Sequence, residues 1–200
     1  MYQNGIKIVL DKIVALMAFL LVSPIFICIT LILLFVQKKV FFIQTRVGKN
    51  QKRFQIFKFK TMSEERDADG KLLPDDARIT TFGKFLRATS LDELPQLLNI
   101  LQGNMSLVGP RPLLPDYVHL YSKEQNKRHN VLPGITGFVQ VKGRNTLTWE
   151  ERFALDVYYV EHISFLFDCK ILFLTFITLF EFKKSKPQNG ISIEPFEGQW

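Results

Sequence analysis

The sequence predicts a mainly helical α+β fold whose N-terminal helix lies in a membrane. Three observations support this prediction: a long apolar run at residues 13–36, two strand-like segments at residues 40–60, and later segments with helical periodicity. The chain has 200 residues, is 47% hydrophobic and carries a formal charge of +7. This combination suits one small domain that meets a membrane surface or a phosphate-bearing partner. Nucleic acid would suit the charge but not the apolar segments.

The apolar run at residues 13–36 is interrupted only by Ser23, Pro24 and Thr30. Such a run is long enough to cross a hydrocarbon core of about 30 Å at about 1.5 Å per residue. Proline removes a helical hydrogen bond, so a kink is expected near the middle of the run. Two topologies compete: a straight span, and a re-entrant hairpin over residues 1–38 whose ends return to one face. The denser basic cluster after the run places the following domain on the cytoplasmic side.

Residues 40–45 and 54–60 predict two strands joined through Gly48-Lys49-Asn50. Across the whole hairpin, phenylalanines are interleaved with basic residues: Phe41, Phe42, Phe54, Phe57 and Phe59 with Arg46, Lys52, Arg53, Lys58 and Lys60. This ribbon either rests on anionic headgroups, at about 1 kcal/mol per nearby cation, or is a half-buried hairpin with a solvated basic face. Residues 63–77 are charged and rich in turn formers, and they predict an exposed loop.

Periodicity and capping predict the elements that follow. In chain order they are a helix over 80–88, a strand over 105–108, an amphipathic helix over 115–130, a loop over 133–137 and a strand over 139–141. Thr148 with Glu151 forms a capping-box pattern, which predicts that a helix begins there.

The segment 163–182 is very apolar but is interrupted by Asp168 and Lys170. Its uninterrupted part is too short to span a bilayer, which favours an interfacial helix; a buried core helix is the alternative. Residues 186–200 are polar and predict a flexible tail. The chain is thereby divided into segments 1–38, 39–185 and 186–200.

The stretch at residues 90–99, Ser-Leu-Asp-Glu-Leu-Pro-Gln-Leu-Leu-Asn, carries two adjacent carboxylates at the expected start of a helix. Ser90 with Glu93 fits a capping box. Asp92 as the cap is the other option, because it places Pro95 in the first helical turn. In either case both carboxylates lie at the positive end of the helix dipole, which favours an ionised aspartate and attracts phosphate. Spacing alone favours a merely structural cap, since caps are far commoner than nucleophiles.

Three arginines, Arg87, Arg111 and Arg144, fall on constrained turns. Arg111 lies between two prolines, which stiffen the backbone around it. Arginine binds phosphate oxygens bidentately, and Mg²⁺ usually takes one or two carboxylates together with substrate phosphates. With Asp92 and Glu93, these arginines indicate phosphoryl transfer beside a membrane, in which one carboxylate attacks phosphorus and its neighbour moves a proton.

Several motifs in fixed order carry a family resemblance. They are Phe-Lys-Phe-Lys-Thr-Met at 57–62, Ser-Leu-Asp-Glu-Leu-Pro-Gln at 90–96, Ser-Leu-Val-Gly-Pro-Arg-Pro at 106–112, Pro-Gly-Ile-Thr-Gly at 133–137 with Gly-Arg-Asn at 143–145, and Leu-Asp-Val-Tyr-Tyr-Val at 155–160. Together they resemble the bacterial sugar transferases, the monotopic phosphoglycosyl transferases that start glycan assembly. The resemblance covers residues 1 to about 185. The short length and single N-terminal apolar segment are most similar to the bacillosamine-type members.

The resemblance implies that Asp92 is the nucleophile. It would attack the diphosphate of a UDP-sugar, release UMP and hold the sugar 1-phosphate as an aspartyl ester, which undecaprenyl phosphate then takes over. UDP-N,N′-diacetylbacillosamine or a related N-acetylated amino sugar is the implied donor. Mg²⁺ is the implied metal, bound by Asp92 and Glu93, with Glu93 as metal partner or base. The implied substrate and phosphate contacts are Arg87, Arg111, Arg144, Lys58, Lys60 and Asp156.

The resemblance also implies a location. Ser23-Pro24 matches the family's break in a re-entrant membrane helix, which favours the hairpin over the straight span. The expected architecture is then a re-entrant helical hairpin followed by a small cytosolic catalytic domain with a short β-hairpin and interfacial amphipathic helices. It lies on the cytoplasmic face of the inner membrane, with membrane lipids and downstream glycosyltransferases as further partners and no nucleic acid.

Two other functions compete with this interpretation. A membrane-anchored basic adaptor for anionic lipid or nucleic acid would explain the charge and the apolar segments, but not the clustered Asp92-Glu93 with a rigid Arg111. A lipid-phosphate hydrolase would use the same residues with water as the acceptor.

Overall fold

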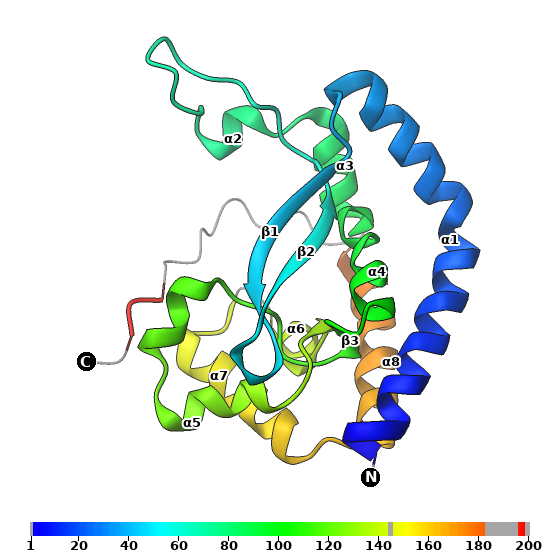
Figure 1. Ribbon diagram of the computed structural model, residues 1–200, viewed down its shortest axis with the longest axis vertical. Helices are drawn as coiled ribbons and strands as arrows, with labels where there is room; N and C mark the ends of the chain where they lie inside the picture. The colour runs from blue at the N-terminus through cyan, green and yellow to red at the C-terminus, as the bar shows by residue number, and fades with distance from the viewer. Residues whose placement is uncertain (1, 144–145, 183–195, 199–200) are drawn as a thin grey trace.

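The computed structural model describes residues 2–143, 146–182 and 196–198 (Figure 1). Its helices are α1 (Lys7–Gln37), α2 (Asp75–Arg78), α3 (Thr81–Ala88), α4 (Gln96–Leu101), α5 (Lys123–Asn126), α6 (Phe138–Lys142), α7 (Trp149–Glu161) and α8 (Phe165–Phe182). Its strands are β1 (Phe41–Val47), β2 (Arg53–Phe59), β3 (Ser106–Val108) and β4 (Gly134–Thr136). The fold is therefore mainly helical α+β, as the sequence predicts.

Helix α1 is one continuous element of 31 residues that passes through Ser23 and Pro24. The hydroxyl of Ser23 donates to the carbonyl of Leu20 at 2.8 Å, and the helix is curved in Figure 1. Within the described residues, α1 is the one helix long and apolar enough to cross a membrane. The kink expected at Pro24 therefore does not interrupt the helix, which is continuous and curved, and the re-entrant topology stays a prediction.

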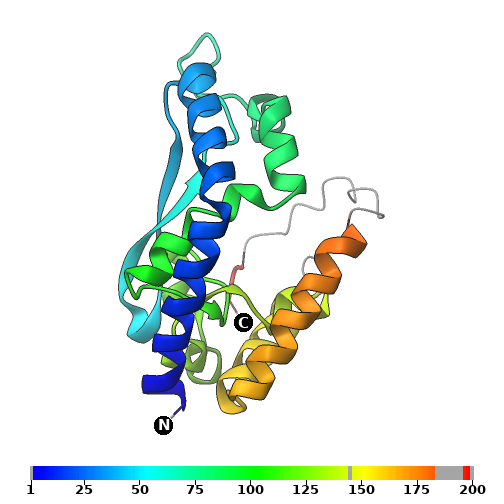
Figure 2. The same cartoon turned by 90° about the vertical axis from the view of Figure 1, so that its right-hand side faces the viewer.

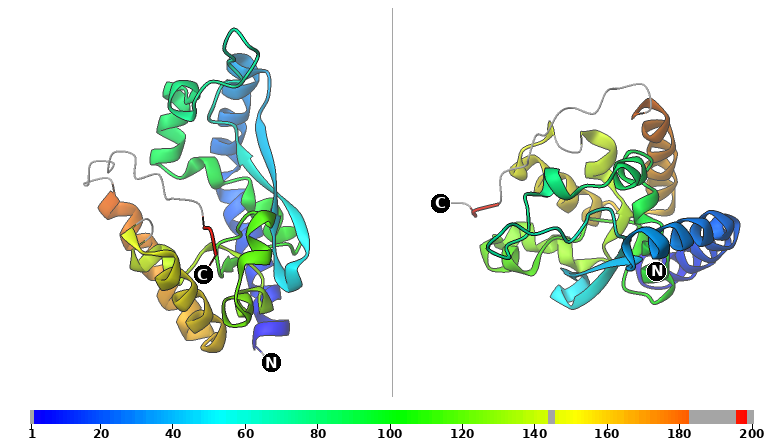
Figure 3. Two further views of the ribbon diagram at one scale, coloured as in Figure 1. Left: turned by 90° about the vertical axis from the view of Figure 1, so that its left-hand side faces the viewer. Right: turned by 90° about the horizontal axis from the view of Figure 1, so that it is seen from above.

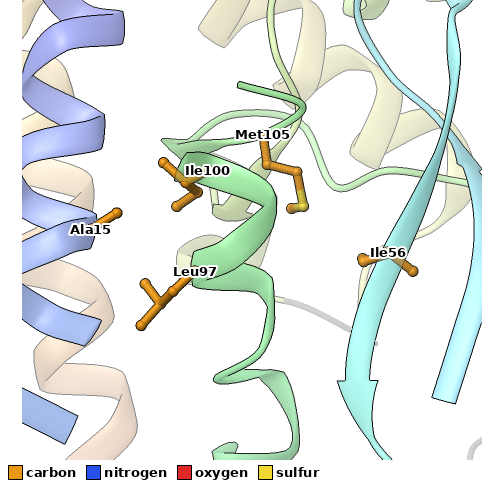
Figure 4. Close-up of a cluster of buried hydrophobic side chains, with 5 residues drawn as sticks. All are labelled: Ala15, Ile56, Leu97, Ile100 and Met105. Atoms are coloured by element: carbon orange, nitrogen blue, oxygen red, sulfur yellow. The ribbon is translucent and has the colours of Figure 1, made fainter. Parts of the chain in front are cut away.

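The inner face of α1 packs on the rest of the chain along most of its length. Near its first half, Ala15 contacts a buried cluster of Ile56, Leu97, Ile100 and Met105, drawn in Figure 4. Near its second half, a further buried cluster joins Ile29 and Leu33 to Phe59 and Leu86. Both halves of the helix are therefore held by the same domain.

A buried polar cluster fixes the first turn of α1 to the first turn of α8. Lys7 Nζ donates to Asp168 Oδ2 at 2.6 Å, and both side chains are only 6% exposed. The hydroxyls of Tyr2 and Tyr159 donate to the same carboxylate at 2.6 and 2.7 Å. Because the carboxylate has three donors, its burial is compensated. Figure 2 shows α1 and α8 on one side of the molecule, closest where both begin.

The outer faces of these two helices carry many exposed apolar side chains. On α1 they include Val9, Ile13, Met17, Leu20, Leu21, Ile25, Phe35 and Val36, and on α8 they include Phe165, Leu166, Phe173 and Phe176. The opposite face of α8 is buried at Asp168 and Ile171. Such a large exposed apolar surface is typical of a membrane or partner contact. The division of α8 into a packed and an exposed face supports the interfacial interpretation over the buried core helix.

The predicted hairpin is confirmed. Strands β1 and β2 pair in antiparallel, with Phe41 opposite Phe59 and Gln44 opposite Ile56. A 3₁₀ turn, Lys49–Gln51, makes the connection. Three other predictions of local structure also hold: the loop over 63–77 is mostly irregular, the helix over 80–88 is α3, and the strand over 105–108 is β3.

The single helix expected over 115–130 is wrong. The segment divides into a 3₁₀ helix Pro115–Leu120, α5, and a 3₁₀ helix Lys127–Asn130. The reason is local: Ser122 accepts from the backbone N–H of Gln125 at 3.2 Å, and the side chain of Gln125 accepts from the N–H of Ser122 at 2.9 Å. This capping box starts a new helix in the middle of the segment.

The strand expected over 139–141 is also wrong, because those residues form α6. The strand that pairs with β3 is β4, inside the segment predicted as a loop, and the pairing is parallel. The capping box of Thr148 and Glu151 is confirmed at the start of α7. Of the predicted tail 186–200, the structure describes residues 196–198, where Phe196 is 6% exposed; for the rest, flexibility stays a prediction.

Candidate active site

Asp92 and Glu93 lie in a 3₁₀ turn, Leu91–Glu93, between α3 and α4. Neither predicted cap forms. Ser90 is in the left-handed region at φ 57° and makes no side-chain cap bond, and α4 begins after Pro95 without a side-chain cap. The reason is that the Glu93 carboxylate binds two cations instead of one backbone N–H, which is the stronger interaction.

Glu93 joins the hairpin to the loop after β3. Its Oε1 accepts from Lys58 Nζ at 2.6 Å and from Arg111 Nη2 at 2.7 Å. The Glu93 side chain is 19% exposed. Burial alone would raise its pKa, but the charges of Arg111 and Lys58 outweigh burial and hold the pKa of Glu93 at about 2. Glu93 is therefore a fixed anion at ordinary pH.

Asp92 contrasts with its neighbour. Within the described residues its carboxylate has no hydrogen bond or ion pair. Burial raises the pKa of Asp92, the charge of Lys58 opposes that rise, and the charge of Glu93 adds to it. Arg87 and Arg111 also stabilise the Asp92 anion. The site thus holds a carboxylate whose oxygens are free, in the field of three cations.

Arg87 reaches this site from the last turn of α3. Its Nε donates to Thr61 Oγ1 at 3.0 Å, and Thr61 is the second residue after the end of β2. One turn earlier, a Cβ added at Gly83 would overlap the carbonyl of Thr61. Glycine therefore allows α3 to approach the hairpin closely, and this approach brings Arg87 beside Asp92.

Arg111 is held by the parallel pair β3–β4. The N–H of Gly109 donates to the carbonyl of Thr136 at 2.9 Å, and the N–H of Gly134 donates to the carbonyl of Pro110 at 3.0 Å. A Cβ at Gly134 would overlap the backbone N of Gly109. The Pro-Gly-Ile-Thr-Gly segment therefore supports the Gly-Pro-Arg-Pro turn through backbone hydrogen bonds.

A buried ion pair lies behind that turn. Arg128 Nη2 donates to Asp156 Oδ2 at 2.8 Å and to the backbone carbonyl of Arg111 at 2.8 Å. The structure therefore places Asp156 against Arg128 and away from solvent. Burial raises the pKa of Asp156, and Arg128 opposes this rise. Sequence reasoning missed Arg128 because its neighbours, Lys127 and His129, made it look like part of a solvated basic run.

Asn99 is a second residue that sequence reasoning missed. Its side chain is 0% exposed, and it bonds to the backbone of β2 in both directions. Oδ1 accepts from the N–H of Phe57 at 3.1 Å, and Nδ2 donates to the carbonyl of Gln55 at 2.7 Å. The amide therefore fixes β2 against α4 at the point from which Lys58 reaches Glu93. An asparagine inside the apolar run Leu-Leu-Asn-Ile-Leu was the available signal, because buried polar groups need partners.

The other predicted residues lie elsewhere or cannot be placed. Lys60 Nζ pairs with Glu64 Oε1 at 3.0 Å, and Glu64 also binds Lys39 at 2.8 Å. Arg144 lies outside the described residues. Ser23 and Pro24 lie in the middle of α1.

A divalent cation would have two carboxylates here. Within the part of the chain that the structure describes, no group of three or more His, Cys, Asp or Glu side chains could hold a metal. Asp92 has both oxygens free, and Glu93 has Oε2 free, among the described residues. This donor set fits Mg²⁺, which takes one or two carboxylates and completes its shell with phosphate oxygens and water.

The comparisons with known proteins agree with this chemistry. The family model described as bacterial sugar transferase matches residues 2–182. An uncharacterized sugar transferase, EpsL, of Bacillus subtilis (strain 168) is 51% identical over 159 residues, which are 80% of this chain and 79% of EpsL. The exopolysaccharide production protein ExoY of Rhizobium meliloti (strain 1021) is 38% identical over 183 residues, 82% of this chain and 81% of ExoY.

A longer relative carries a more specific name. The UDP-glucose:undecaprenyl-phosphate glucose-1-phosphate transferase of Escherichia coli (strain K12) is 40% identical over 176 residues, 82% of this chain but only 38% of that protein. The matched motifs include those that seat Asp92, Glu93 and Arg111, since the family model spans them all. The chain therefore belongs to the bacterial sugar transferase family and is a transferase enzyme.

Proposed function

We propose that this enzyme transfers a sugar 1-phosphate from a UDP-sugar to undecaprenyl phosphate at a membrane surface. The observation that carries the proposal is the free carboxylate of Asp92, set in the field of Lys58, Arg87 and Arg111 beside an already paired Glu93. A nucleophile must keep its lone pairs free, whereas a structural carboxylate is bonded. Two relatives are named UDP-glucose:undecaprenyl-phosphate glucose-1-phosphate transferase and a third is named undecaprenyl-phosphate glucose phosphotransferase, and these names support the same reaction class.

The first step in this proposal is attack of an Asp92 oxygen on the phosphorus that bears the sugar. The bond from that phosphorus to the bridging oxygen breaks, and UMP leaves with the electron pair. Arg111 and Lys58 offset the charge that gathers on the phosphoryl oxygens. In the second step a phosphate oxygen of undecaprenyl phosphate attacks the same phosphorus and restores the Asp92 carboxylate.

Glu93 positions this machinery rather than moving a proton. A group whose pKa is about 2 and whose Oε1 already binds two cations is a poor base near neutral pH. Its negative charge holds Lys58 and Arg111 at one place. With Asp92 it would also hold Mg²⁺, which when bound supplies further neutralisation of the diphosphate.

Asp156 has a positioning role in this proposal instead of the substrate contact implied by the resemblance. Its carboxylate is used by Arg128, and Arg128 holds the carbonyl of Arg111. Lys60, which follows the last residue of β2, is bonded to Glu64, so it is a weaker candidate for a phosphate contact than Lys58.

The exposed apolar faces of α1 and α8 support a membrane-bound site for a lipid acceptor. Exposing its long tail to water would cost about 0.8 kcal/mol per CH₂, so the phosphate is best met at headgroup level. We propose the re-entrant topology for α1, because both of its halves pack on the same domain and Lys7 is buried against Asp168. A straight span would have to separate these contacts. The cytoplasmic face of the inner membrane is the proposed location, since the basic cluster follows the apolar run.

Topology is tested by cysteine labels at Gln3 and Gln37, placed after Cys28 and Cys169 are replaced by serine. The re-entrant proposal expects both labels to react with an impermeant reagent from the same face of intact vesicles. Reaction from opposite faces would establish a full span and contradict the proposal.

The proposed donor is UDP-N,N′-diacetylbacillosamine or a related N-acetylated amino sugar, as the motif resemblance implies. Purified enzyme in detergent, with Mg²⁺ and undecaprenyl phosphate, should release UMP from this donor faster than from UDP-glucose or UDP-galactose. Preference for UDP-glucose would refute the proposed donor but would leave the proposed reaction class unaffected. Release of free sugar 1-phosphate without a lipid-linked product would refute transfer and indicate hydrolysis.

A further inference from the structure

The described C-terminal segment, residues 196–198, is packed against aromatic side chains of the domain (red in Figures 1 and 3). Four rings surround Phe196, and we call them the aromatic cage: Tyr117, Tyr121, Trp149 and Phe153. The ring centroid of Phe196 lies 4.9 Å from that of Phe153 and 5.6 Å from that of Trp149. Phe196, near the C-terminal end of the chain, is thus buried among these four rings, and we call it the C-terminal plug.

A second contact holds the same segment. Gly198 lies against the side chain of Leu120, and its φ of +90° suits glycine. Leu120 ends the 3₁₀ helix that also carries Tyr117, while Trp149 and Phe153 belong to α7. The segment therefore bridges two elements that are otherwise separated in the sequence.

The aromatic cage also contacts the buried arginine behind the active site. Arg128 Cζ lies 5.6 Å from the ring centroid of Phe153 and 5.8 Å from that of Tyr121. These two rings touch Phe196 as well. One ring therefore separates the C-terminal plug from Arg128, and Arg128 donates to the carbonyl of Arg111.

We infer that Phe196 is a positioning residue for the active site. By filling the aromatic cage it keeps water from the Arg128–Asp156 pair and so fixes the turn that presents Arg111 to Glu93. Dry surroundings strengthen both the ion pair and the cation–π contacts, and an empty cage would admit water to them. This inference rests on the proposed function, because its effect on turnover is defined only for phosphoglycosyl transfer.

The test combines fluorescence with kinetics. The chain has two tryptophans, Trp149 and Trp200, so Trp200→Phe leaves a single reporter inside the cage. In that background we compare Phe196→Ala, the apolar replacement Phe196→Leu, and Glu197→Ala as a control at an exposed neighbouring position. Quenching of Trp149 by acrylamide reports whether the cage is filled. UMP release gives kcat and KM.

Phe196→Ala should raise the quenching of Trp149 and lower kcat/KM by about tenfold, because small displacements of a positioned group are costly. Phe196→Leu should keep most of the protection of Trp149 from quenching and most of kcat/KM, and Glu197→Ala should change neither the quenching nor kcat/KM. In an Arg111→Gln background, Phe196→Ala should have no further effect on kcat/KM, because both changes act on the same group.

Three results would overturn the inference. Unchanged quenching in Phe196→Ala would mean that the cage is not filled by this residue. Changed quenching with unchanged kcat/KM would mean that the plug does not act on the active site. Additive losses with Arg111→Gln would mean that it acts by another route. Fluorescence needs no turnover, so an enzyme that docks its tail but releases no UMP in any variant refutes the proposed function alone.

Discussion

Replacing Asn99 with alanine tests how α4 fixes the position of Lys58. The amide of Asn99 satisfies one backbone donor, Phe57, and one backbone acceptor, Gln55, on β2. Its side chain is 0% exposed, so water cannot readily replace it. An unsatisfied buried group costs about 1–3 kcal/mol, and two such groups give a loss of about 2–6 kcal/mol in the free energy of unfolding.

The same change should impair catalysis. Lys58 directly follows Phe57, and its Nζ lies 2.6 Å from Glu93 Oε1. A shift of β2 by a fraction of an ångström lengthens that contact, and we expect kcat/KM to fall by about 10–100-fold. The assay is UMP release, measured well below the melting temperature of the variant, with urea unfolding for stability.

Two further variants make this result interpretable. Asn99→Asp keeps the acceptor for Phe57 but places a buried, unpaired carboxylate oxygen against the carbonyl of Gln55, so at neutral pH it should be no more stable than Asn99→Ala. Asn104→Ala removes a surface hydrogen bond to Gln102 and should behave like wild type. If Asn99→Ala were as active and as stable as Asn104→Ala, the argument that α4 positions β2 through this amide would be refuted.

The remaining predictions concern pH, close packing and the buried ion pair. Because the charge of Lys58 opposes the raised pKa of Asp92, Lys58→Met should raise that pKa further. Activity that requires ionised Asp92 is lost as pH falls, so the acid limb of the kcat/KM profile should move to higher pH. An acid limb that does not move would contradict this prediction. Gly83→Ala places a Cβ on a backbone carbonyl and should cost about 3 kcal/mol or more in urea unfolding; neutrality would show that α3 can move away freely. Lys7→Met leaves the buried Asp168 and Asp11 without their shared cation and should cost about 3–5 kcal/mol. The double change Lys7→Met with Asp168→Leu should recover the part due to Asp168, and no recovery at all would contradict a coupling of these two charges.

Local patterns predict the parts of this fold that depend on local forces. The hairpin follows from two strand-like segments joined through Gly48-Lys49-Asn50, and α7 follows from the capping box at Thr148. The same kind of signal at Ser122 and Gln125 was available but was hidden inside an apparently continuous helical pattern. This capping box is the reason that the segment 115–130 does not form the single helix predicted.

Partners far apart in the sequence could not be predicted in the same way. The parallel pairing of β3 with β4 depends on the close approach of Gly134 to Gly109, which no local pattern encodes. The sequence could single out Asp92 and Glu93 as a pair of adjacent carboxylates, but their different environments depend on Lys58 and Arg111, which arrive from other elements. The sequence could therefore indicate which side chains to examine, but not which carboxylate is free and which is paired.

The roles of Arg128 and Asn99 show the same limit. Both are polar residues whose partners lie on distant segments, at Asp156 and Arg111 for Arg128 and on β2 for Asn99. Burial of a polar group can be suspected from an apolar neighbourhood, but its partner is known only from the fold.

The central claim is that Asp92 carries the sugar phosphate, and the most direct measurement is the intact mass of the enzyme after mixing with UDP-sugar in the absence of acceptor. The account predicts a mass increase equal to one sugar phosphate, its disappearance when undecaprenyl phosphate is added, and its absence in Asp92→Asn. An adduct of the same mass on Asp92→Asn, or full turnover by that variant, would contradict it.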